Sequence, residues 1–263
     1  RQGDSISDME FVRSYCENNG IKLYVKQVDI PELAAKQGKG IEQTAREQRY
    51  GFFEELYRTE DIDLIATAHH GNDQAESIII NLVRGAALDG ISGMAPVNGK
   101  YIKPFLCVTK REIEQYCSEE SIQYKVDSTN SDVNYTRNYV RHIINPLLAA
   151  INPDFTETIM RNSEYIRAEK YYLERISENI YNEIAAENDG EVLINVQRLM
   201  GYDEVIRARI YRKAALRTGV KQDLYAVHYT LIDGMADKCR KGAVLDMPGG
   251  LKVSLGHGGM LFS

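Results

Sequence analysis

The chain has 263 residues, enough for one large or two medium-sized domains, and its formal net charge of −6 argues against a broadly basic nucleic-acid-binding protein. It has no run of 18 or more apolar residues and no amino-terminal signal pattern, which argues against a membrane-spanning or exported protein, so we expect a cytoplasmic location. Cysteines occur singly, without a C-x-x-C pair, which argues against a disulfide scaffold, a zinc site or an iron–sulfur cluster. They are Cys16, Cys107, Cys117 and Cys239.

The first part of the chain alternates predicted helices and strands. An unstructured polar segment opens it, followed by a helix over residues 8–19 and a strand over 23–28. A polar connector over 31–40 precedes an amphipathic helix over 41–59, and a short apolar run over 64–68 predicts a buried strand. Helical spacing returns at Ile78, Ile79, Leu82 and Val83. This order predicts right-handed crossovers and a parallel sheet.

Two histidines and two carboxylates lie where the strand over 64–68 runs into the next helix. Ligands of open α/β sheets bind at the carboxyl ends of strands, so we expect the chemistry at His69, His70, Asp73 and Glu76. The two carboxylates share one face of the first helical turn and could hold an ammonium group. The alternative is that they only cap the helix. A metal site is not expected, because adjacent histidines in a strand point to opposite sides.

Two later stretches are candidates for binding an anion. Residues 84–94 contain three glycines and Arg84, which predicts either a loop that approaches a ligand or a plain connection. A short strand over 101–105 follows, then a helix to about residue 120 that starts at a Thr109/Glu112 capping box. Beyond a turn over 127–130, Arg137 and Arg141 are one helical turn apart. Two guanidinium groups on one face suit a phosphate chain or an RNA backbone, although a solvated pair is the alternative.

The second half of the chain is predicted to be mainly helical. We place a domain boundary near residue 150, at Asn152-Pro153, followed by one long helix over residues 155–186 that Asn188-Asp189-Gly190 ends. Helices over 203–217 and 223–238 and a β-ribbon of three strands (243–247, 251–255 and 260–262) complete it. Six basic residues between positions 198 and 217 form either an RNA-docking face or a solvated helix face.

Several motifs together resemble the tRNA(Ile)-lysidine synthetases, members of the N-type ATP pyrophosphatase (PP-loop) family. They are Ala45-Arg46-x-x-Arg49-Tyr50, Ala68-His69-His70-x-x-Asp73-Gln74-x-Glu76-Ser77, Arg84-Gly85 with Gly90-Ile91-Ser92-Gly93-Met94, and Asp127-Ser128-Thr129-Asn130 with Tyr135-x-Arg137-Asn138-x-x-Arg141. The resemblance covers nearly the whole chain. It implies an α/β fold: a truncated doubly wound parallel sheet of the adenine nucleotide alpha hydrolase type over residues 1–150, then a helical tRNA-binding domain with a small β-ribbon over 151–263.

The resemblance also implies a two-step reaction. ATP adenylates C2 of the wobble cytidine of isoleucine tRNA with release of pyrophosphate, and the ε-amine of free lysine then displaces AMP. ATP and Mg²⁺ are the implied cofactors, isoleucine tRNA and lysine the implied partners, and a homodimer is left open. Asp73 and Glu76 match the lysine-binding positions. The catalytic candidates are Arg49, His69, His70 and Arg141, and the candidates for contacts with ATP or tRNA are Arg46, Arg84, Asp127, Asn130, Arg137 and Asn138.

This sequence departs from the family pattern in two ways. Ser77 replaces the usual threonine and keeps its hydroxyl. The Ser-Gly-Gly-x-Asp-Ser phosphate loop does not precede residue 1, and we therefore expect that the chain as written cannot bind ATP productively. The competing hypotheses are a PP-loop tRNA thiolase, an amidating ligase, or a non-catalytic RNA-binding remnant.

Overall fold

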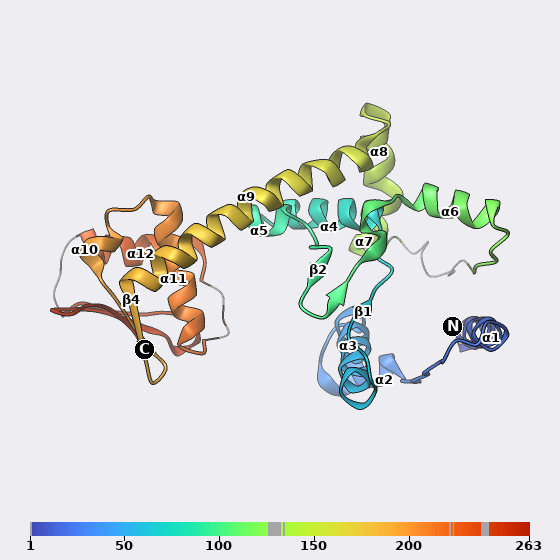
Figure 1. Ribbon diagram of the computed structural model, residues 1–263, viewed down its shortest axis with the longest axis horizontal. Coiled ribbons are helices and arrows are strands. Elements are labelled where there is room, and N and C mark those ends of the chain that lie inside the picture. Colours follow the sequence, from blue (N-terminus) through green and yellow to red (C-terminus); the bar gives the residue numbers. More distant parts are fainter. Residues whose placement is uncertain (1, 126–132, 134, 221, 223, 238–241) are drawn as a thin grey trace. The chain divides into compact units, whose positions relative to one another are not determined.

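The computed structural model describes residues 2–125, 133, 135–220, 222, 224–237 and 242–263 (Figure 1). The chain divides into two compact units, residues 1–167 and 168–263. The division falls inside one continuous helix of 30 residues, α9 (Phe155–Ile184), whereas we placed a domain boundary near residue 150. The assignment of catalysis to residues 1–150 and of tRNA binding to 151–263 stays a prediction.

The first unit is mainly helical. Its helices are α1 (Gln2–Asn18), α2 (Ile30–Gln37), α3 (Ile41–Thr59), α4 (Gly71–Val83), α5 (Leu88–Ile91), α6 (Lys110–Glu119), α7 (Thr136–Tyr139), α8 (Asn145–Ile151) and the first part of α9. A 3₁₀ turn covers Pro104–Cys107, and a π-helical turn, Val140–Ile144, joins α7 to α8. Helix α4 contacts α5, α7 and both of these turns, so it is the centre of this unit.

The first unit also contains a small mixed sheet, whose strands lie before and after α4 in the sequence. Its strands are β1 (Ile65–Ala66), β2 (Val97–Asn98) and β3 (Tyr101–Ile102), in the order β1-β3-β2. Strands β1 and β3 are parallel, whereas β2 and β3 are antiparallel. In the described residues, the expected parallel sheet is therefore present as one parallel pair. The carboxyl ends of β1 and β3 lie at the same edge, and the segments that follow them carry His69 and Lys103.

Local capping explains which helix predictions in the first unit are confirmed. Helix α3 has the predicted bounds, and α6 starts at the predicted capping box: the Thr109 N–H donates to Glu112 Oε2 at 2.7 Å. The predicted connector over residues 31–40 is wrong. Asp29 caps α2 there, and Gly38, at φ 63°, ends that helix in the left-handed conformation.

Two further predictions in the first unit are wrong, and a third is confirmed only in part. Residues 23–28 alternate in polarity, but they form no strand, and the polar start of the chain is helical from Gln2. The predicted strand over 64–68 is reduced to two residues, and Leu64 is 53% exposed rather than buried. Alternation and short apolar runs specify a strand only where a neighbouring strand is available to pair with it.

The second unit is a five-stranded antiparallel sheet with helices on one face (Figure 1). Its strands are β4 (Ala185–Asn188), β5 (Glu191–Ile194), β6 (Val244–Asp246), β7 (Lys252–Gly256) and β8 (Gly259–Phe262), in the order β4-β5-β8-β7-β6. Its helices are α10 (Val196–Leu199), α11 (Glu204–Arg217), α12 (Ala226–Asp237) and the last part of α9. The predicted β-ribbon is the β6-β7-β8 part of this sheet. The predicted helix end is wrong: α9 stops at Ile184, and Asp189 and Gly190 take positive φ in the turn between β4 and β5.

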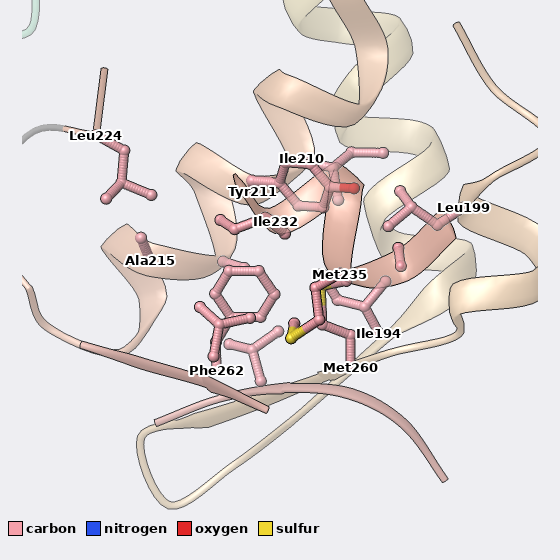
Figure 2. Close-up of a cluster of buried hydrophobic side chains, with 14 of the residues drawn as sticks. Ile194, Leu199, Ile210, Tyr211, Ala215, Leu224, Ile232, Met235, Met260 and Phe262 are labelled. Carbon is pink, nitrogen blue, oxygen red and sulfur yellow. The ribbon is translucent and has the colours of Figure 1, made fainter. Parts of the chain in front are cut away.

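The core of the second unit lies between this sheet and its helices. Figure 2 shows Met260 and Phe262 of β8 facing Ile210 and Tyr211 of α11 and Ile232 of α12. All five are fully buried. At about 25 cal/mol per Å² of apolar surface removed from water, side chains of this size contribute roughly 2 kcal/mol each before the entropy cost of ordering them.

Candidate functional site

Asp73 ties the start of α4 to the segment before it. The His70 backbone N–H donates to Asp73 Oδ2 at 3.1 Å, and the His70 Nε2 lies 3.5 Å from the same oxygen. The capping alternative is therefore correct for Asp73. The His70 Nδ1 is buried and makes no side-chain hydrogen bond in the described part of the chain.

Glu76 is not part of the cap and is instead the anion of a buried ion-pair network. Its side chain is 1% exposed, and Arg141 contacts it in a bidentate manner, with Nε at 2.6 Å from Oε1 and Nη2 at 3.0 Å from Oε2. The same Nη2 donates to Asp73 Oδ1 at 3.2 Å. Arg137 Nε lies 3.6 Å from Glu76 Oε2, and Arg137 Nη2 donates to Ser77 Oγ at 2.6 Å.

This network joins two groups of residues that the sequence presented separately. The two arginines expected to bind anions are paired with the two carboxylates expected to bind an ammonium group. The carboxylates differ in access, because the Asp73 side chain is 14% exposed and the Glu76 side chain only 1%. A ligand can therefore reach Asp73, whereas Glu76 is enclosed. The π-helical turn that carries Arg141 is a rare local conformation that occurs frequently at functional sites.

His69 lies among several positive charges at the carboxyl end of β1. Its Nδ1 is 2.9 Å from Thr67 Oγ1, and its side chain is half-buried. Burial lowers the pKa of His69; Asp73 opposes this effect, and the positive charges of Arg137, Lys103 and Arg46 add to it. The imidazole is therefore neutral at pH 7, and three cations lie close enough to affect it.

Lys103 is a residue of this site that the sequence analysis missed. It follows β3 at the same sheet edge where His69 follows β1, and its Nζ donates to the Ala95 carbonyl at 3.3 Å. Burial lowers the pKa of Lys103, and the positive charge of Arg46 lowers it further. The predicted strand over 101–105 contained Lys103 in its interior, whereas β3 ends at Ile102, so the sequence carried no signal for this residue. A cluster of Arg46, Lys103 and Arg137 around a neutral imidazole suits an oxyanion such as phosphate.

Gln74 fixes the glycine-rich segment over 84–94 against α4. Its buried amide accepts from the Met94 N–H at 2.7 Å and donates to the Met94 carbonyl and to Ser163 Oγ, both at 3.2 Å. A Cβ at Gly93, whose φ is +66°, would lie 2.5 Å from this amide. Arg167 also donates to the Ser92 and Met94 carbonyls. The segment is thus held in place rather than being a plain connection, and part of it forms α5.

Comparisons with known proteins show the family to which this chain belongs. Residues 1–148, which include both strand ends and the whole ion-pair network, match the family model described as PP-loop domain. The chain belongs to the PP-loop family. The chain is 32% identical over 269 residues to a tRNA(Ile)-lysidine synthase of Geobacillus kaustophilus, and the alignment covers 100% of this chain and 58% of that protein.

Two other relatives of this PP-loop chain carry the same name. It is 31% identical over 270 residues to the protein of Bacillus subtilis, covering 100% of the chain and 57% of the relative. It is 32% identical over 254 residues to the protein of Clostridium acetobutylicum, covering 95% of the chain and 55% of the relative. The chain therefore spans a little over half the length of the curated relatives it matches.

The remaining predicted site residues of the PP-loop domain are less enclosed. Arg46 is exposed and lies 4.8 Å from the centre of the Tyr50 ring; Arg49 is exposed on α3; and Arg84 is exposed at the end of α4. Asn138 is partly buried in α7. Asp127 and Asn130 lie outside the described residues. Among the described residues of this group, Arg46 is the one whose charge affects His69.

The basic stretch in the second unit is largely neutralised by carboxylates. Arg207 Nη2 pairs with Asp233 at 2.7 Å, Arg198 with Glu183 at 2.9 Å, Arg217 with Glu187 at 3.4 Å, and Lys213 pairs with Glu178. The Arg207–Asp233 pair is partly buried, with side chains 17% and 15% exposed. These contacts reduce the positive charge that the stretch presents, and its role as an RNA-docking face stays a prediction.

The described residues contain neither a cluster of metal ligands nor a helix suited to crossing a membrane. Within the described residues, no three side chains of His, Cys, Asp or Glu come together as a metal site. None of the described helices combines the length and apolar composition needed to cross a bilayer. Cys16, Cys107 and Cys117 are free thiols, as expected.

Proposed function

We propose that this chain belongs to a tRNA(Ile)-lysidine synthase, a ligase that uses ATP to join lysine to C2 of the wobble cytidine of isoleucine tRNA in the cytoplasm. One observation carries the proposal: a cationic cluster around His69 and a carboxylate pair on α4 meet beyond the carboxyl ends of β1 and β3. The PP-loop match and the names of the curated relatives support it. The parallel β1–β3 pair supports the finer assignment of the first unit to the adenine nucleotide alpha hydrolase-like fold.

The first chemical step needs positive charge. The cytosine O2 attacks the α-phosphorus of ATP, the bond to the leaving pyrophosphate breaks, and an adenylate forms at C2. Arg46, Lys103 and Arg137 would neutralise the charge on the phosphates, because guanidinium and ammonium groups stabilise developing oxyanions in a partly buried site.

The second step needs a carboxylate and an acceptor for a proton. We assign the contact with the lysine ε-ammonium to Asp73, because its side chain is accessible, and we assign to Glu76 the positioning of Arg137 and Arg141. The amine must lose a proton before its nitrogen attacks C2 and AMP leaves with O2. His69 is neutral at pH 7 because burial lowers its pKa, so it can accept that proton.

The test compares the KM for lysine with the KM for ATP in variants of the product of the complete gene. Asp73→Ala removes a charged partner worth about 1.5–3 kcal/mol, so the KM for lysine should rise about 10- to 100-fold while the KM for ATP changes little. Glu114→Ala is the control, since Glu114 forms only an exposed pair with Lys110 on α6. An equal rise in both KM values in Asp73→Ala would refute the assignment of Asp73 to the amine.

A further inference from the structure

A cavity of about 360 Å³ in the first unit adjoins the cationic cluster through Lys103. Its walls come from α4, the β2–β3 hairpin, the 3₁₀ turn and the first part of α9, and they are mainly apolar. The apolar wall residues are Pro96, Val97, Ile102, Pro104, Leu106 and Met160. This volume is near the lower limit of small-molecule sites, so it suits a single ring system rather than a whole nucleotide.

Few polar groups of the cavity are free to bind a ligand. Gln74 and Ser163 already bond to each other, and their remaining groups bond to the backbone. Glu164 is exposed and forms no ion pair with any residue that the structure describes. Arg167 uses Nη2 to hold the glycine-rich segment, but its Nε is buried and lacks a partner among the described residues. The cavity thus offers one carboxylate acceptor and one guanidinium donor between apolar walls.

We propose that this cavity is a nucleobase pocket that accepts a base with an exocyclic amino group beside a ring-nitrogen acceptor, the edge that cytosine and adenine share. The amino group would donate to Glu164, and the ring nitrogen would accept from Arg167 Nε. The apolar walls pack against the faces of the ring. A phosphate attached to the base would then lie toward Lys103 and Arg46. The inference rests on the proposed function, which supplies such a base either from RNA or from ATP.

The apolar walls favour a base over a free amino acid. Lysine would bring two ammonium groups and a carboxylate, and desolvating charges against these walls costs more than desolvating a neutral ring. Uracil has the size of cytosine but turns a carbonyl oxygen toward Glu164, which repels it. The pocket should therefore discriminate between the two pyrimidines.

Cys107 provides a direct probe, because it is exposed and lines the cavity. Alkylation of Cys107 would be followed by mass spectrometry during titration with CMP, AMP, UMP or lysine, with Cys117 of α6 as an internal control outside the cavity. We expect CMP or AMP to slow the reaction of Cys107 about tenfold at ten times the Kd, and to leave Cys117 unchanged. Protection by CMP alone would identify the base of the RNA, and protection by AMP alone would identify that of ATP. Protection by lysine alone, equal protection by UMP, or no protection would overturn the inference.

Two pairs of variants complete the test. Val97→Phe fills the cavity from an exposed position on β2, whereas Asn98→Phe adds the same ring to the next residue, which does not line it. Glu164→Ala removes the carboxylate, and Glu169→Ala is its exposed control on the same helix. Protection should be lost in Val97→Phe and Glu164→Ala only. Lysidine formation without any protection of Cys107 would refute the pocket alone, and protection without lysidine formation would refute the proposed function alone.

Discussion

Replacement of Glu76 by alanine should destabilise the first unit strongly. The substitution leaves the Arg141 guanidinium without its bidentate partner in a place where it is only 27% exposed, and Arg137 loses its ion pair as well. Breaking a buried pair costs about 3–5 kcal/mol, and partial access of water to Arg141 favours the lower end, about 3 kcal/mol. For a unit of this size, that corresponds to a fall in Tm of about 6–12 °C.

Thermal and urea unfolding of the chain would measure this effect. Glu114→Ala serves as the control, because its ion pair with Lys110 on α6 is exposed and should be worth less than about 0.5 kcal/mol. The double variant Glu76→Ala/Arg141→Ala should be less destabilised than the sum of the two single variants, since it also removes the guanidinium group that has lost its bidentate partner. A Glu76→Ala protein as stable as Glu114→Ala would refute the account of the network.

Three further predictions follow from single contacts. The NMR titration midpoint of His69 should lie below its usual value of about 6.5 because burial disfavours the imidazolium, and Arg137→Gln should raise it by removing a positive charge; a midpoint above 6.5 would contradict this. Gly93→Ala should cost about 2–4 kcal/mol, because its Cβ would meet a buried amide at a positive φ, whereas Gly85→Ala, with open space around it, should cost only about 1–2 kcal/mol in urea unfolding. Asp233→Ala should destabilise the second unit by about 3 kcal/mol at pH 7, because it leaves Arg207 without its partly buried ion-pair partner. In urea unfolding of the unchanged chain, the stabilisation from this ion pair should disappear as the pH falls through the lowered pKa of Asp233, because the native carboxylate becomes protonated there.

Elements with local signals could be predicted from the sequence. Helix α6 starts where Thr109 and Glu112 form a capping box, and α3 has an amphipathic pattern with a glycine before it. Both signals depend on residues within one or two helical turns, so the rest of the fold does not alter them. Elements that need a distant partner were predicted poorly. Residues 23–28 alternate as a strand does and yet form none.

The turn between β4 and β5 shows a second limit. Asn188-Asp189-Gly190 is compatible with the end of a helix and with a tight hairpin, because both need residues that tolerate positive φ. The choice depends on whether residues 191–194 find a partner strand, and β8 provides it from more than sixty positions later in the chain. Such a contact cannot be read from the local sequence.

The sequence predicted which residues form the site but not which of them form ion pairs with each other. The motif residues His69, Asp73 and Glu76 come together as the strand-to-helix pattern indicated. The sequence could not show that Arg141 binds the two carboxylates, because the network joins α4 to a segment about sixty-five positions away. The sequence also gave no reason to prefer Lys103 over other lysines, because its place at the site depends on the parallel pairing of β3 with β1.

Incorporation of labelled lysine into isoleucine tRNA tests the proposed ligation most directly. The product of the complete gene would be incubated with ATP, labelled lysine and an isoleucine tRNA transcript whose wobble base is cytidine, and compared with a transcript that carries uridine there. If the proposed reaction is correct, the label should enter only the first transcript, at the wobble nucleotide, with one AMP and one pyrophosphate released for each lysine joined. Release of AMP without transfer of lysine, or equal labelling of both transcripts, would contradict it.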